Sequence, residues 1–205
     1  MKQRIYIILL LLAIILTGCS AGKKELIGTW SGEADVTQLV RDVLESNEED
    51  EFADYLSIPE LKLDCTVTFT TLNTFRMEIG KTSVEVMVAK IQEILKKAME
   101  DYLNNEIQKE GRTATLEEIL ASQNTSIDEI ISEIIPDGTV DDILKDVSFS
   151  GQFTVRNRKL MISYDENSKP SAQIYYLYDI VGENLYIHEG TAELGVSCPL
   201  KLRKY

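Results

Sequence analysis

Hydrophobic and polar residues alternate through the first and last thirds of the chain, a pattern typical of half-buried strands. The alternation predicts strands over residues 26–36, 61–70 and 74–79, and again over 147–155, 160–164, 174–180, 185–187 and 196–202. Short turns separate most of the later strands, as in an antiparallel meander. We therefore predict a mainly β fold with a helical insert, built as an antiparallel meander or up-and-down barrel.

The period changes from 2 to 3.6 residues in the middle of the chain. It predicts a helix from residue 82 to about 104, with Thr82 and Glu85 as a capping box and Gly111 as its stop. The pattern also predicts a shorter helix over residues 37–44 and a charged loop over residues 46–54. The helical insertion is expected at about 82–147, within a domain that covers residues 26–205.

Three similar segments inside the insertion begin at Thr115, Ser126 and Thr139. Each starts with a hydroxyl residue, continues with acidic residues and ends in an apolar pair. Hydroxyls satisfy the first N–H groups of a helix, and acids complement its dipole. A spacing of this kind is too short for a solenoid repeat, so we predict three short helices that are capped alike.

Two basic residues, Lys2 and Arg4, stand near the start of the sequence, and an apolar run over residues 5–16 follows them. That run is shorter than the about 20 residues of a membrane span and suits a secretory signal. It ends in Leu16-Thr17-Gly18-Cys19, which resembles the bacterial lipobox. The resemblance implies that residues 1–18 are a signal peptide and that residues 19–25 tether the protein to a membrane through a lipidated Cys19.

An extracytoplasmic location, at the cell membrane, follows from this resemblance. Removal of the signal leaves 19 of the 21 Lys and Arg residues against 34 Asp and Glu residues, a net charge of −15. This acidity argues against nucleic acid as a partner. It also predicts that an anionic membrane repels the mature chain as a whole.

Two cysteines remain for the folded protein. Cys65 keeps phase with the apolar residues of one predicted strand, and Cys198 with those of the last. A disulfide between them is one interpretation, because export permits oxidation. Two buried free thiols are the other.

The sequence shows little catalytic or metal-binding chemistry. His188 is the one histidine, and no nucleophile motif or phosphate-binding glycine loop accompanies it. No further histidine or cysteine stands at ligand spacing for a metal. We therefore expect no enzyme activity, no metal and no cofactor.

Gly28-Thr29-Trp30 opens the first predicted strand, directly after the tether. Together with the hairpin, the acidic insert and residues 151–160 and 177–185, it resembles lipocalin-like (calycin-type) lipoproteins of Gram-positive bacteria. The resemblance covers residues 26–205 and implies that Trp30 covers one end of a barrel. It implies no particular activity.

Two functions are expected of such a barrel. In the first, the protein binds an apolar or amphipathic small ligand or a partner protein. In the second, side chains fill the barrel, which is then a structural or protein-interaction module of the cell envelope. Binding of a small ligand would require a cavity, whose expected lining is Trp30, Phe69, Phe153, Tyr176 and Tyr178.

Overall fold

The computed structural model describes residues 22–47, 50–165, 168–192, 196 and 198–205, and it divides into two compact units. The barrel unit comprises the described residues up to Ala34, together with Asp64–Glu78 and Val147–Tyr205. The helical unit comprises Asp35–Leu63 and Ile79–Asp146. The predicted signal peptide, Cys19 and the first part of the tether lie outside the described residues.

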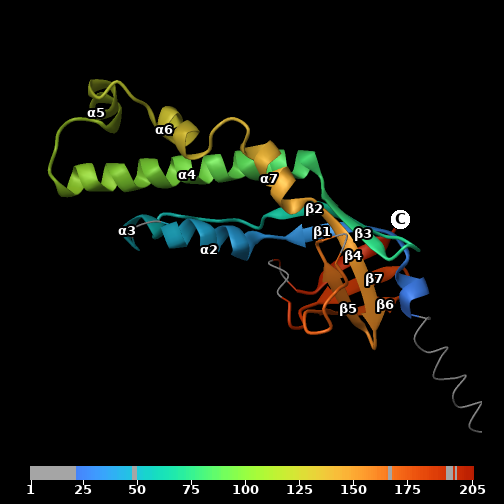
Figure 1. Ribbon diagram of the computed structural model, residues 1–205. Helices are drawn as coiled ribbons and strands as arrows, with labels where there is room; N and C mark the ends of the chain where they lie inside the picture. Colours follow the sequence, from blue (N-terminus) through green and yellow to red (C-terminus); the bar gives the residue numbers. More distant parts are fainter. Residues whose placement is uncertain (1–21, 48–49, 166–167, 193–195, 197) are drawn as a thin grey trace, which may run out of the picture. The chain divides into compact units, whose positions relative to one another are not determined.

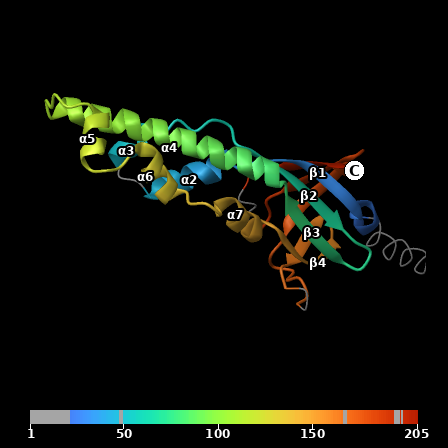
Figure 2. The same cartoon turned by 90° about the horizontal axis from the view of Figure 1, so that it is seen from above.

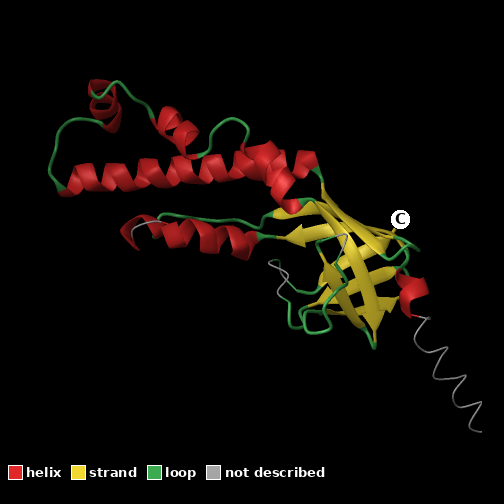
Figure 3. Cartoon of the chain, in the orientation of Figure 1, coloured by secondary structure: helices red, strands yellow, loops and turns green. Residues whose placement is uncertain are grey.

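Eight antiparallel strands form a closed barrel in which each strand pairs with its neighbours in chain order (Figures 1 and 3). The prediction of an antiparallel barrel is therefore confirmed. The strands are β1 (Gly28–Asp35), β2 (Lys62–Phe69), β3 (Thr74–Ile79), β4 (Phe149–Arg156), β5 (Lys159–Ser163), β6 (Tyr176–Val181), β7 (Asn184–His188) and β8 (Leu200–Lys204).

Pairing between the first and last strands closes the barrel. Trp30 on β1 stands opposite Lys204 on β8, and Gly32 stands opposite Leu202. A Cβ on Gly32 would lie 2.4 Å from the carbonyl oxygen of Lys201, so this approach of the two backbones requires glycine. Closure leaves the barrel without a free edge.

Tight turns join several neighbouring strands. Asn157 and Arg158 both have positive φ, of 51° and 60°, between the paired residues Arg156 and Lys159. Two consecutive left-handed residues match the right-handed twist of a hairpin. In the two-residue turn between β6 and β7, Gly182 alone has positive φ, of 62°.

Alternate residues of each strand point into the barrel, as the sequence pattern predicts. Phe69 and Phe153 meet edge to face with ring centroids 5.0 Å apart, and Phe75 continues this contact with Phe149 at 6.0 Å. Trp30, Phe153, Leu185 and Leu202 are among the most deeply buried large side chains of the protein.

One end of the barrel holds both ends of the described chain. We call it the N-terminal end, because a short helix over residues 22–26 lies there (Figure 1). Antiparallel order also places the β2–β3, β4–β5 and β6–β7 turns and the end of β8 at this end. The β5–β6 and β7–β8 loops lie at the opposite end.

The helical unit is built around one long helix. Its elements are α2 (Thr37–Asn47), α3 (Asp50–Ala53), α4 (Lys81–Lys109), α5 (Leu116–Ser122), α6 (Ile127–Ile134) and α7 (Thr139–Val147) (Figure 2). Its core consists of Phe52, Leu95, Ala98, Ile127 and Ile131. None of the helices among the described residues is long and apolar enough to cross a membrane.

The helix caps follow the sequence pattern only in part. Thr115 and Glu118 form a full capping box on α5, and the Ser126 hydroxyl accepts a hydrogen bond from the Glu129 amide. The predicted box of Thr82 and Glu85 is wrong, because α4 begins one residue before Thr82 and its cap, Gly80, makes no side-chain bond. The Thr139 hydroxyl donates to the Pro136 carbonyl, at 2.7 Å, and does not cap α7.

Three predicted boundaries also need correction. Residues 50–53 form α3 inside the predicted loop over 46–54, where Phe52 gains burial in the helical core. Val147 ends α7, so the next strand begins at Phe149. The last strand begins at Leu200, later than the predicted 196.

Ile131 and Ile134 offer a matched test of the helical core. Both lie on α6, but Ile131 is 5% exposed and Ile134 is 50% exposed. We expect Ile131→Ala to lower the free energy of unfolding by about 3 kcal/mol, because it leaves a cavity in the core. Ile134→Ala should change it by less than about 1 kcal/mol. Urea denaturation followed by circular dichroism measures both, and equal effects would contradict this core.

Candidate functional site

All five residues predicted to line a cavity are buried inside the barrel, namely Trp30, Phe69, Phe153, Tyr176 and Tyr178. Two of them pack ring against ring, as given above for Phe69 and Phe153. Tyr178 is the one that lines a pocket described for this unit.

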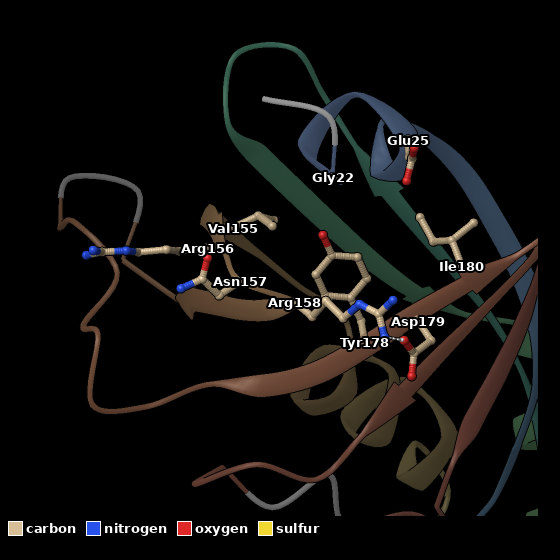
Figure 4. Close-up of a pocket in the computed structure, with 9 residues that line it drawn as sticks. All are labelled: Gly22, Glu25, Val155, Arg156, Asn157, Arg158, Tyr178, Asp179 and Ile180. Atoms are coloured by element: carbon tan, nitrogen blue, oxygen red, sulfur yellow. Dashed lines mark hydrogen bonds and ion pairs between the residues drawn. The ribbon is translucent and has the colours of Figure 1, made fainter. Parts of the chain in front are cut away.

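That pocket has a volume of about 270 Å³ and lies at the N-terminal end of the barrel (Figure 4). This is slightly below the about 300 Å³ at which small-molecule sites usually begin. Polar groups form much of its wall. It is lined by Gly22, Glu25, Val155, Arg156, Asn157, Arg158, Tyr178, Asp179 and Ile180.

The short helix over residues 22–26 covers this end of the barrel. Trp30 anchors it, because the indole Nε1 donates a hydrogen bond of 2.7 Å to the Leu26 carbonyl. Leu26 itself is fully buried. At Gly22 a Cβ would lie 2.7 Å from the Tyr178 hydroxyl, so the start of the helix closely approaches that ring. Trp30 thus fixes the chain at the barrel end from which it continues toward Cys19.

Charged side chains line part of this pocket. Arg158 donates to Asp179 at 2.9 Å, while Arg156 extends away from Tyr178 (Figure 4). Burial raises the pKa of the Tyr178 hydroxyl, and the Glu25 carboxylate adds to the rise. This tyrosine therefore stays neutral at physiological pH and contributes a neutral hydroxyl to the pocket.

A second hollow lies on the outside of the barrel. Its volume is about 490 Å³, and its wall includes the exposed residues Val181, Glu183, Lys201 and Arg203. Arg203 pairs with Glu183 at 3.1 Å. The exposure of these residues makes it an open surface groove, distinct from the enclosed cup expected of a carrier.

The disulfide interpretation is not supported. Cys65 and Cys198 are both free; Cys65 is buried and Cys198 is exposed. The sequence pattern placed Cys198 among the inward-facing residues of the last strand. Cys198 precedes β8, however, so the alternation of that strand does not determine where its side chain lies. The alternative of two buried thiols holds for Cys65 and is wrong for Cys198.

His188 lies at the end of β7, and its side chain is partly exposed. Its Nε2 atom is 3.8 Å from the Asp179 carboxylate, which Arg158 also binds. Among the described residues, no group of three or more His, Cys, Asp or Glu residues is placed to hold a metal ion.

Sequence reasoning identified the aromatic residues but missed the polar pocket beside Tyr178. Arg156 and Arg158 stand in a segment recognised only as a turn, and Glu25 in the predicted tether. Their proximity depends on barrel register and on the docking of residues 22–26. No pattern in the sequence pointed to the bond between Trp30 and the Leu26 carbonyl, because it joins a strand residue to the preceding short helix.

The two thiols should differ in reactivity. Burial raises the pKa of Cys65 to about 11, and the Asp64 carboxylate adds to the rise. We expect one thiol of the folded chain from Ser20 onward to react quickly with Ellman's reagent, and Cys198→Ser to remove that reaction. Loss of the fast reaction in Cys65→Ser instead would contradict the assignment.

The same burial predicts a pH effect on stability. The unfolded chain ionises Cys65 near its ordinary pKa of 9.0, whereas the folded chain does so near 11. The stabilisation is therefore complete below pH 9 and is lost as the pH rises to about 11. Urea denaturation should show that the free energy of unfolding falls less over that pH range in Cys65→Ser than in the parent.

Trp30→Phe should loosen the helix over residues 22–26 selectively. It removes the donor to the buried Leu26 carbonyl, a loss that costs about 1–3 kcal/mol. We expect backbone hydrogen exchange at residues 23–27 to accelerate about tenfold or more. Phe153→Leu is the control, because that interior ring has no hydrogen bond to lose and should loosen the barrel generally. Equal acceleration in the two variants would contradict the anchoring role of Trp30.

Comparisons with protein-family models, with curated proteins and with solved structures found no match to this chain.

Proposed function

We propose that this protein is a lipid-anchored lipocalin-like lipoprotein of the cell envelope whose filled barrel is a scaffold for protein interaction. The barrel holds no small-molecule ligand in this proposal, and the chain is not an enzyme. The observation that carries the proposal is the packing of the barrel interior by its own aromatic and aliphatic side chains.

The interior contacts argue against a carrier. A ligand cup requires free volume between inward-facing side chains. Here Phe69 lies against Phe153, and Phe75 against Phe149, with centroid separations of 5.0 and 6.0 Å. The pocket that Tyr178 lines is small and polar. A hydrophobic ligand would have to displace these rings, at the cost of their mutual packing.

The helical unit carries features that suit a protein partner. Leu39 and Val43 lie one turn apart on α2, and about half of each side chain is exposed. Residues 84–147 hold 15 acidic and 6 basic residues. Exposed apolar side chains on an acidic unit favour a partner that offers both apolar contacts and basic groups.

The lipobox and the antiparallel barrel support the anchored lipocalin-like part of the proposal. Lipidation would attach the chain at Cys19, a few residues before the helix that Trp30 anchors. Several acyl chains on one cysteine give stable membrane attachment, which one chain does not. The proposal therefore places the barrel outside the cell membrane and close to it.

Mass spectrometry tests both parts. We expect the protein extracted from membranes to carry acyl chains on Cys19, and Cys19→Ser to lack them. Native spectra of the exported chain from Ser20 onward should show the bare polypeptide mass. A small molecule that accompanies the protein and leaves on denaturation would contradict the filled barrel.

A cavity variant supplies the positive control. Phe153→Ala should open an apolar void that accepts benzene, seen as a rise in the melting temperature on benzene addition. The parent should show no rise. If Phe153→Ala does not fold, Phe69→Leu provides a smaller void. Stabilisation of the parent by benzene would show free internal volume and favour the carrier function.

A further inference from the structure

We propose that the N-terminal end of the barrel is a membrane-docking surface, which lies on the anionic phospholipid headgroups around the anchor. This inference rests on the proposed lipidation of Cys19. It adds that the folded barrel itself contacts the membrane, with a defined end facing the lipid.

The length of chain before the barrel limits its distance from the membrane. Cys19 is three residues before Gly22, where the described helix begins. Three residues span at most about 10 Å, even when extended. The helix in turn is fixed to the barrel by the Trp30–Leu26 hydrogen bond and by burial of Leu26. A lipid on Cys19 would therefore hold this end of the barrel within reach of the headgroups.

Basic residues outnumber acidic ones at this end, in contrast to the chain as a whole. The acids of its helix, turns and strand ends are Glu25, Asp179 and Glu183. Two of these three are already paired, Asp179 with Arg158 and Glu183 with Arg203. The bases are Lys23, Lys24, Arg156, Arg158, Arg203 and Lys204.

Lys24 and Arg156 are the most available of these cations. Both are exposed, and the described residues place no carboxylate within ion-pair distance of either. They come from separate parts of the chain, the helix over residues 22–26 and the end of β4. Basic groups held near an anionic membrane each favour binding, by about fivefold in affinity.

Exposed apolar residues lie at the same end. Leu72, in the β2–β3 turn, is 80% exposed; Val181, at the end of β6, is 63% exposed; and Tyr205, after β8, is 95% exposed. Apolar side chains on turn tips can enter the interfacial region, and tyrosine favours that depth. The cations suit the anionic headgroups, and the exposed apolar side chains suit the interfacial region beneath them.

The net charge of −15 does not prevent this contact. Salt screens exposed charges beyond about 8 Å at physiological ionic strength. Charges close to the lipid therefore decide the interaction, and those at this end are mainly positive. The expectation of repulsion, drawn from the whole chain, applies to its other surfaces.

Vesicle co-sedimentation of the unlipidated mature chain, Cys19→Ser, tests the surface without the anchor. We expect binding to vesicles of phosphatidylcholine mixed with phosphatidylglycerol, and much weaker binding to phosphatidylcholine. Arg156→Gln should weaken binding about fivefold. Lys169→Gln changes net charge equally but lies in the β5–β6 loop at the opposite end, so it should have little effect. Equal effects of both changes, or no preference for phosphatidylglycerol, would overturn the proposal.

Hydrogen exchange of the lipidated protein on the same vesicles gives a second readout. We expect protection of residues 71–73 and 157–158 at the N-terminal end, and none at residues 190–192 at the opposite end. Uniform or absent protection would overturn the docking surface. Acylation is read separately from the mass of the purified protein. Missing acyl chains would refute the anchor, whereas acylated protein without local protection would refute only the docking.

Discussion

Closure of the barrel through β1 and β8 is the constraint on which the rest of this structure depends. Pairing of Trp30 with Lys204 brings the two ends of the described chain together, and the Tyr205 amide donates to the Thr29 carbonyl at 2.9 Å. A closed sheet also fixes which residues face inward. Those residues must either fill the interior or enclose a ligand, and here they pack against one another.

Closure also concentrates chemistry at one end. Antiparallel order returns every second turn to the end where the described chain begins, so Leu72, Arg156 and Lys204 lie at the same end of the barrel as the helix over residues 22–26. Distant segments thus contribute to one surface. Its composition differs from that of the whole chain because turns and strand ends, rather than strand faces, supply its exposed side chains.

Local pattern predicted much of the barrel and little of the site. The alternation around Phe69, Phe153 and Tyr178 identified inward-facing residues correctly, because period 2 reports directly on the two faces of a strand. The same alternation gave a wrong prediction for Cys198, because the apolar pattern extends to residues that precede β8. It also could not foresee that Phe69 meets Phe153, since that contact depends on register across β2, β3 and β4. The polar pocket beside Tyr178 depends likewise on packing between segments that are far apart in sequence.

The double interruption of the barrel by helices has a consequence for how the chain folds. Thr74 and Gln152 are register partners on adjacent strands, yet 78 positions separate them in the sequence. Pairing them in an unstructured chain would require closing a long loop, whereas a helical segment that has already folded removes much of that conformational freedom. Helix formation is fast and local, while non-local strand pairing is slow. The helical unit therefore acts as a folded connector, and damage to its core would slow barrel assembly even where no barrel residue is changed.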